Sequence, residues 1–80
     1  MGRQKSQSNL QVFGSNVRRL RHARALSLRS LATQCNIDHS AIARIEKGEK
    51  NITILTLMEL AKGLEIHPRK LLDLDFRLDD

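Results

Sequence analysis

The sequence contains no tryptophan, no tyrosine and only two phenylalanines among its 80 residues. Proteins that bind single-stranded nucleic acid or read RNA stack the bases on aromatic side chains, which this chain almost lacks. Its single cysteine, Cys35, excludes an internal disulfide and suits a reducing compartment. No apolar run is long enough to cross a membrane, and the polar opening does not resemble a secretion signal. We therefore expect a cytoplasmic protein that does not contact a membrane.

Groups that carry chemistry are also scarce. The three histidines fall on different predicted helices, with no spacing typical of a metal site. Asp38, His39 and Ser40 are the three residue types of a Ser-His-Asp catalytic triad. Consecutive residues of a helix point in different directions, however, so they cannot form one path for proton transfer. Cys35 on an apolar helical face is typical of packing. The sequence predicts a protein that is not an enzyme and has no cofactor, no metal and no small-molecule ligand.

The charge of the chain is unevenly distributed. Residues 1–50 hold ten Lys/Arg against three Asp/Glu, a net of +7, whereas residues 51–80 hold four against six, a net of −2. A basic half joined to a slightly acidic half indicates one face for a polyanion and another for a different contact. Because reading duplex DNA through a groove needs no aromatic side chain, double-stranded DNA fits this composition best.

Apolar residues recur at helical spacing throughout, and no stretch alternates as a strand would. Pro68 suits the first turn of a short fifth helix, and the ending LDLDFRLDD fits either an extended tail or a fraying helix end. We predict an all-α fold: a compact five-helix domain over residues 9–80 that includes a C-terminal dimerisation region, after a flexible arm, residues 1–8. Four side chains can cap the N-termini of the first four helices: Ser8, Ser27, Asp38 and Thr53.

Two further patterns predict packing. Gly14 lies inside the first helix, where it is ~1 kcal/mol less favourable than alanine, so we expect it to permit a close approach. The inner stripe of the fourth helix is expected to comprise Ile54, Leu57, Ala61 and Leu64.

The segment NID, residues 36–38, separates the second predicted helix, residues 28–35, from the third. Asn36 tolerates the left-handed conformation that closes a helix, and Asp38 can accept the free N–H groups of the next turn. Ile37 between them is apolar and would point into the core. Two helices joined by so short a corner must cross steeply, which is the geometry of a helix-turn-helix formed by helices two and three.

The outward face of the third predicted helix carries no acidic and no large apolar side chain. An ordinary solvated face would more often mix Glu with Lys, so the pattern favours a surface that meets a polyanion. Ala43 is small enough to let the backbone approach a groove floor, and arginine to guanine is the commonest specific base contact. We predict base reading by His39, Ser40, Ala43 and Arg44. Ser27 and Arg29, at the start of helix two, suit a backbone phosphate.

Four segments, FGSNVRRLR, LSLRSLA, NIDHSAIARIEKGEKNIT and LMELAKGLEI, resemble the phage-repressor-type (Xre/Cro-like) helix-turn-helix regulators of bacteria and phages. The segment EKGEKNIT and the small size look like the controller proteins of restriction–modification systems. The resemblance implies a five-helix DNA-binding domain, often dimeric, with helix three in the major groove. It also implies that the loop after helix three binds the phosphates of the DNA backbone through Lys47, Lys50, Asn51 and Thr53.

Departures from the family pattern limit this transfer. Leu28 stands where members often have Gln, which removes an expected contact to DNA, and Ala25 stands where a Gly is usual. Controller proteins usually carry larger polar or aromatic residues at the positions of Ser40 and Ala41. Their target sequence therefore cannot be transferred to this chain.

Arg21 and Glu46 each border an apolar stripe, because they follow Val17 and Ile42 by four residues. Opposite charges on two core-facing edges predict a partly buried ion pair, and the family carries a similar Arg–Glu pair at matching positions. The alternative is two snorkelling side chains. Three other arginines are expected to be solvated charges of helix one, with contact to DNA as the alternative: Arg18, Arg19 and Arg24.

The second half of the chain has more apolar residues than a core of this size can easily bury. We predict that these form the interface of a homodimer, and that the protein is a sequence-specific transcriptional regulator that binds a palindromic operator. The alternative is a protein-interaction module, such as an antitoxin or adaptor, whose partner would use the same residues. The expected interface comprises Leu55, Met58, Leu74 and Phe76.

Overall fold

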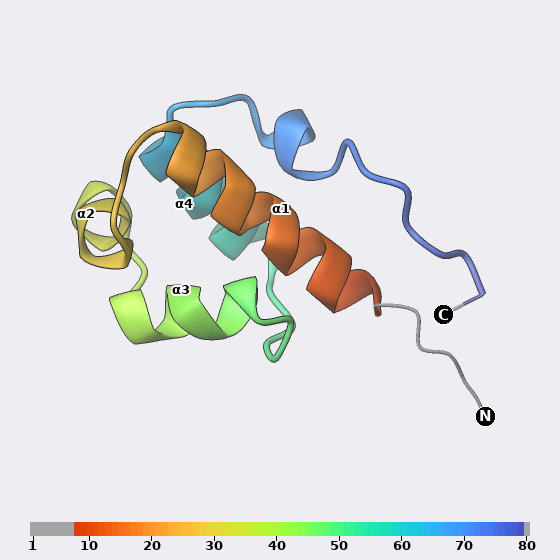
Figure 1. Ribbon diagram of the computed structural model, residues 1–80. Helices are drawn as coiled ribbons and strands as arrows, with labels where there is room; N and C mark the ends of the chain where they lie inside the picture. The colour runs from red at the N-terminus through yellow and green to blue at the C-terminus, as the bar shows by residue number, and fades with distance from the viewer. Residues whose placement is uncertain (1–7, 80) are drawn as a thin grey trace.

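The computed structural model describes residues 8–79, and these are helical with no strand. Four α-helices, α1 (Asn9–Ala23), α2 (Leu28–Gln34), α3 (His39–Glu46) and α4 (Ile54–Leu64), precede a short 3-10 helix, η1 (Pro68–Leu71) (Figure 1). Of the predicted flexible arm, only Ser8 lies within the described residues, and it caps α1. No helix in the described part of the chain combines the length and apolar character needed to cross a bilayer.

The all-α prediction is confirmed, but the prediction of five α-helices is wrong, because the described chain has four. Pro68 does begin a helical turn, capped by His67, yet the turn is a four-residue 3-10 helix. After it, Leu74 and Phe76 are half-buried while Asp73 and Asp75 are exposed. This period of two belongs to an extended chain, so the burial pattern of the tail favours extension over a further helical turn.

Each α-helix begins at a polar side chain that accepts a backbone N–H of its first turn. Ser8 and Gln11 form a capping box, with the Gln11 N–H 3.2 Å from Ser8 Oγ and the Ser8 N–H 3.0 Å from Gln11 Oε1. Ser27, Asp38 and Thr53 cap α2, α3 and α4. All four predicted caps are therefore confirmed. A cap of this kind is typically worth ~1 kcal/mol, so helix starts are strongly specified by local sequence.

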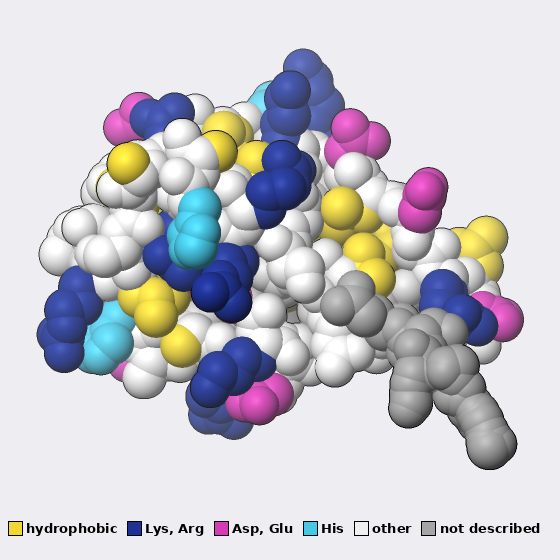
Figure 2. Space-filling view, in the orientation of Figure 1, with side chains coloured by type: hydrophobic (Ala, Val, Ile, Leu, Met, Phe, Trp, Pro, Cys, Tyr) yellow, Lys and Arg dark blue, Asp and Glu magenta, His cyan; other side chains and the backbone are white. Residues whose placement is uncertain are grey.

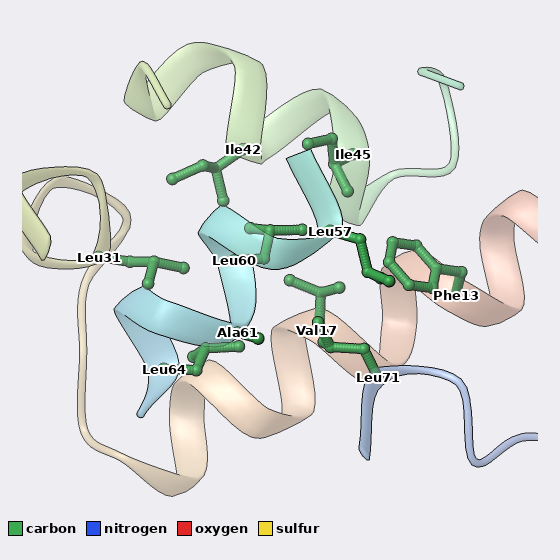
Figure 3. Close-up of a cluster of buried hydrophobic side chains, with 10 residues drawn as sticks. All are labelled: Phe13, Val17, Leu31, Ile42, Ile45, Leu57, Leu60, Ala61, Leu64 and Leu71. Carbon is green, nitrogen blue, oxygen red and sulfur yellow. The ribbon is translucent and has the colours of Figure 1, made fainter. Parts of the chain in front are cut away.

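A hydrophobic core lies between the four α-helices and η1, and Figure 3 shows its side chains converging. Leu60, which is fully buried, belongs to the inner stripe of α4. Ile54, predicted for that stripe, is 69% exposed, because it lies in the first turn at the edge of the core. The buried hydrophobic residues are Phe13, Val17, Leu31, Ile42, Ile45, Leu57, Leu60, Ala61, Leu64 and Leu71.

The corner between α2 and α3 is as short as predicted, but it is built differently. Cys35 leaves α2 in an extended conformation, with φ −146° and ψ 171°. The left-handed conformation predicted for Asn36 is wrong, since Ala25 and Glu65 are the non-glycine residues with positive φ in the described chain. The backbone N–H of Asn36 instead donates to Glu59 Oε1 of α4 at 3.1 Å. Ile37 packs against the core as expected.

Asn16 connects α1 to the C-terminal segment from inside the fold. Its side chain is buried, and its Nδ2 donates to the carbonyl oxygens of Lys70 at 3.2 Å and Leu71 at 3.4 Å. Its Oδ1 accepts a 2.6 Å hydrogen bond from Arg19 Nη2. Because a buried amide is costly unless it is hydrogen-bonded, these contacts fix η1 against α1.

At Gly14 the backbone of α1 comes close to the backbone at the end of α3. A Cβ built on Gly14 would lie only 2.6 Å from the Glu46 carbonyl oxygen and would also collide with that of Ile45. Both obstacles are backbone atoms at the end of α3, which cannot rotate away. The predicted close approach is confirmed, and it brings the end of α3 against α1.

We expect Gly14→Ala to lower the free energy of unfolding by ~1–3 kcal/mol, the usual cost of overpacking. Circular dichroism during urea titration measures this, and suits a chain without tryptophan or tyrosine. Ser15→Ala, at the adjacent exposed position, should change the value by less than ~0.5 kcal/mol. Equal stability of the two variants would contradict the close packing.

Candidate nucleic-acid interface

Arg21 and Glu46 form a bidentate ion pair that joins α1 to α3. Arg21 Nε lies 2.7 Å from Glu46 Oε2, and Nη2 lies 3.0 Å from Oε1. Nη1 of Arg21 also donates to the carbonyl oxygen of Leu26 at 2.8 Å. The two side chains are only 9% and 6% exposed. The structure therefore brings together the two residues that the sequence paired, and the contact fixes α3 relative to α1 and to the turn before α2.

The N-terminus of α3 is organised by Asp38. Its carboxylate accepts hydrogen bonds from the Ser40 hydroxyl and from the Ser40 backbone N–H, the latter at 3.1 Å. These bonds lower the pKa of the Asp38 carboxyl, with the hydroxyl bond the larger cause. The carboxylate cap is therefore fully present above the usual range of an aspartate and is lost as pH falls through the lowered pKa. His39 Nδ1 lies 3.8 Å from the same carboxyl group.

The predicted base-reading residues all lie on α3. Ser40 and Arg44 are exposed, and His39 and Ala43 are half-buried. Because the Ser40 hydroxyl donates its hydrogen to Asp38, its oxygen can serve a base only as an acceptor, through its two lone pairs. Arg44 forms no ion pair or side-chain hydrogen bond within the described residues, which leaves all five guanidinium donors available.

The predicted phosphate contacts surround α3. Arg29, Lys47 and Asn51 are exposed and Lys50 is half-buried. The hydroxyls of Ser27 and Thr53 accept the N–H groups of Ser30 at 3.0 Å and Thr56 at 3.1 Å. These two side chains therefore serve first as helix caps, and they present the ends of α2 and α4 beside α3.

A shallow hollow of about 180 Å³ lies where α1 meets α3. Arg18 lines it together with Ala43 and Lys47, above the buried ion pair. Lys and Arg side chains gather over this region in Figure 2. The sequence predicts a solvated charge at Arg18, with contact to DNA as the alternative. The sequence does contain a sign of this position, because Arg18 lies three residues before Arg21 and therefore on the same side of α1.

The predicted interface residues divide into two groups. Leu55 and Met58 project from α4 and are 77% and 49% exposed. Leu74 and Phe76 are half-buried in the tail and pack against the core. Leu74 and Phe76 are therefore already partly covered by their own chain, whereas Leu55 and Met58 are left open to solvent.

The remaining chemically reactive groups are the histidines, the acidic residues and Cys35. The described residues bring together no group of three His, Cys, Asp or Glu side chains that could hold a metal ion. Cys35 is half-buried, its thiol donates to the Leu31 carbonyl oxygen at 3.2 Å, and burial raises its pKa. A thiol with a raised pKa is a poor nucleophile, which agrees with a packing role.

Comparison with known proteins agrees with this geometry. The helix-turn-helix family HTH_3 matches residues 17–71, which include the corner and α3. This chain belongs to that family. As a family member it is 32% identical over 63 residues to the control protein C.BamHI of Bacillus amyloliquefaciens, covering 78% of each chain. It is 36% identical over 62 residues to the control protein C.SmaI of Serratia marcescens, covering 78% of this chain and 74% of that protein.

Solved structures of controller proteins share the fold of this family member. The restriction–modification controller protein C.AhdI of Aeromonas hydrophila superposes with a TM-score of 0.77 at 36% identity, over 79% of this chain and 96% of that one. The tetramer of the controller protein C.Esp1396I in complex with its natural 35 base-pair operator gives 0.76 at 25% identity, over 85% and 90%.

We expect Glu46→Ala to lower the free energy of unfolding by ~3–5 kcal/mol, because it leaves the buried Arg21 guanidinium without its partner. Urea unfolding measures the loss. Arg24→Ala is the matched control, since the Arg24–Glu65 pair, at the same 2.7 Å, is exposed on both sides and should contribute less than ~1 kcal/mol. A loss no larger than that of the control would show that the Arg21–Glu46 pair does not hold the fold.

Proposed function

We propose that this protein is a sequence-specific, double-stranded-DNA-binding transcriptional regulator of the control-protein type. The observation that carries the proposal is the acid-free outer face of α3, on which Arg44 is exposed and has no partner among residues 8–79, held rigidly by the buried Arg21–Glu46 pair. Its similarity to two control proteins, and to a controller protein solved as a tetramer with its operator, supports this function. Such a regulator acts in the bacterial cytoplasm, by binding rather than catalysis, and needs no cofactor.

Base reading belongs to α3 in this proposal. Arg44 would give a bidentate contact to guanine, and His39 and Ser40 would read bases near the N-terminus of the helix. Ala43 keeps the helix close to the groove floor, because a larger side chain would hold the backbone away. The buried ion pair contributes rigidity, since a contact made by a side chain on a fixed helix loses less conformational entropy on binding.

Phosphate contacts set register and affinity without reading sequence. Cations and amides around α3 suit this role: the exposed Arg29 on α2, Lys47 at the end of α3 and Asn51 in the loop before α4, and the half-buried Lys50 in the same loop. The caps Ser27 and Thr53 would bring the free backbone N–H groups of two helix ends toward the same strands. Arg18, on the rim of the α1–α3 hollow, joins this set.

A homodimer on a palindromic operator completes the proposal. One α3 touches too few base pairs for useful selection among genomic sites. Two copies related by a two-fold axis would present their α3 helices ~34 Å apart, matching half-sites spaced by ~10 base pairs. The exposed Leu55 and Met58 support an interface on α4. The domain that assembles would be residues 9–80.

The same exposed residues support a second candidate, a protein-interaction module such as an antitoxin or adaptor. Ile54, Leu55 and Met58 are 69%, 77% and 49% exposed, which is costly for a monomer in water. Gel filtration of the purified protein separates the two candidates. A stable dimer supports the regulator, whereas a monomer that aggregates supports a missing partner protein.

We expect Arg44→Ala to weaken binding to the preferred duplex by ~1–3 kcal/mol and to relax sequence choice, because a base contact is lost. Lys50→Ala should instead weaken all duplexes about equally and reduce the slope of log affinity against log salt by about one unit. Titrations on a selected duplex and on a random duplex, at several salt concentrations, measure both. Equal losses on the two duplexes for both variants would contradict the division between base and phosphate contacts.

We expect Leu55→Glu with Met58→Glu to give a folded monomer with greatly weakened operator binding, since both side chains are exposed and their loss spares the core. Sedimentation velocity at micromolar concentration measures the oligomeric state. Thr33→Glu with Gln34→Glu adds the same charge to exposed positions of α2 and should leave the dimer intact. A dimer that survives the α4 substitutions would mean that the interface lies elsewhere.

A further inference from the structure

An apolar groove of about 250 Å³ lies between the start of α1, the start of α4 and the C-terminal tail. Leu10 and Phe13 of α1 and Leu57 of α4 line its inner part. Figure 2 shows hydrophobic side chains gathered between α1 and the tail. The outer walls belong to residues that are only partly covered: Ile54, Leu72 and Phe76. One wall of the groove therefore comes from a segment that is neither helix nor strand.

Asn9, the first residue of α1, holds that wall in position. Its Nδ2 donates to the carbonyl oxygen of Arg77 at 2.7 Å, and its Oδ1 accepts the backbone N–H of Arg77, also at 2.7 Å. The two bonds therefore satisfy both the backbone N–H and the backbone carbonyl of Arg77, which lies 68 positions after Asn9 in the chain. We call this contact the Asn9 clamp. It acts on the residue next to Phe76, whose half-buried side chain also packs against the core.

An exposed leucine follows the groove residue Ile54 in α4. Ile54 lines the groove, and Leu55, the following residue of α4, is 77% exposed. In a two-fold dimer each surface meets its own copy, so a projecting side chain beside a hollow can enter the hollow of the partner while the partner does the same. The charge distribution agrees, since residues 8–17, which begin α1, include no Lys or Arg and residues 51–80 carry −2, so copies that meet here do not bring net positive surfaces together.

We propose that Asn9 is a positioning residue for dimerisation: its clamp on the Arg77 backbone holds Phe76 as one wall of the groove that receives Leu55 from a second copy. This inference rests on the proposed homodimer, and it identifies Asn9 as the residue that controls dimer formation. Assembly then depends on whether the tail is clamped, which links the last residues of the chain to operator binding through the dimer.

Sedimentation equilibrium without DNA tests this on the full chain. Asn9→Ala removes both hydrogen bonds, and we expect the dimer dissociation constant to rise roughly tenfold or more, the effect of losing two ordinary hydrogen bonds. Arg77→Pro removes the backbone N–H together with the arginine side chain but keeps the carbonyl oxygen that Asn9 binds, so it should have a smaller effect of the same sign. Arg77→Ala keeps both backbone groups and should leave the dissociation constant unchanged.

Circular dichroism melts at concentrations where each protein is monomeric separate this role from a loss of folding. The Asn9→Ala monomer should keep the helical signal of the parent and a cooperative melt, with a midpoint lowered only by the loss of the two hydrogen bonds that hold the tail. A double-mutant cycle of Asn9→Ala and Leu55→Ala tests whether Asn9 acts through the groove. If the groove is not formed in Asn9→Ala, shortening Leu55 should weaken the dimer little further. We therefore expect the double variant to be weakened less than the product of the two single fold-changes.

The outcomes distinguish this inference from the proposed function. A parent protein that is monomeric at all concentrations overturns the homodimer itself. A dimeric parent whose dissociation constant is unchanged by Asn9→Ala overturns the clamp alone. A loss in Arg77→Ala equal to that in Asn9→Ala would assign the effect to the arginine side chain, and fold-changes that simply multiply would show that Leu55 does not enter the groove.

Discussion

The buried ion pair between Arg21 and Glu46 is the contact on which the position of α3 depends. A guanidinium and a carboxylate are costly to remove from water, and only a full set of hydrogen bonds offsets that cost. Here both carboxylate oxygens are used, and a third bond to the Leu26 carbonyl occupies the remaining guanidinium nitrogen. The pair is directional, unlike hydrophobic contact, so it fixes the rotation of α3 as well as its distance from α1.

The helix α1 organises the rest of the molecule around this pair. Gly14, Arg18 and Arg21, spaced by four and three residues, lie on the side that meets α3. Asn9 and Asn16, seven residues apart, lie on another side and bind the backbone of the C-terminal segment. One helix therefore holds the proposed DNA-reading element and the proposed dimerisation surface in a fixed relation, which two-fold binding to one operator requires.

Two helix ends show how tertiary requirements act on local geometry. Ala25 and Glu65 adopt left-handed φ values of 55° and 57° after α1 and α4, without the glycine that would do so freely. At each end a backbone N–H closes the helix, from Leu26 to the Arg21 carbonyl at 3.1 Å and from Ile66 to the Ala61 carbonyl at 3.0 Å. The Leu26 carbonyl, positioned by the first turn, is the one that Arg21 binds.

The sequence by itself determined the four α-helices, their caps, the close approach at Gly14 and the pairing of Arg21 with Glu46. Helix periodicity and capping depend on residues three or four positions apart, and a charge at the edge of an apolar stripe indicates a contact across the core. Only the tertiary structure decided that Asn36 binds Glu59 rather than turning left-handed, that Ile54 is exposed while Leu60 is buried, and that Arg18 lies beside α3. It alone decided the contacts of Asn9 and Asn16, because their partners lie 68 and about 54 residues away. An asparagine side chain can form hydrogen bonds with any backbone segment that the fold brings near it, so no local sequence pattern predicts which segment that will be.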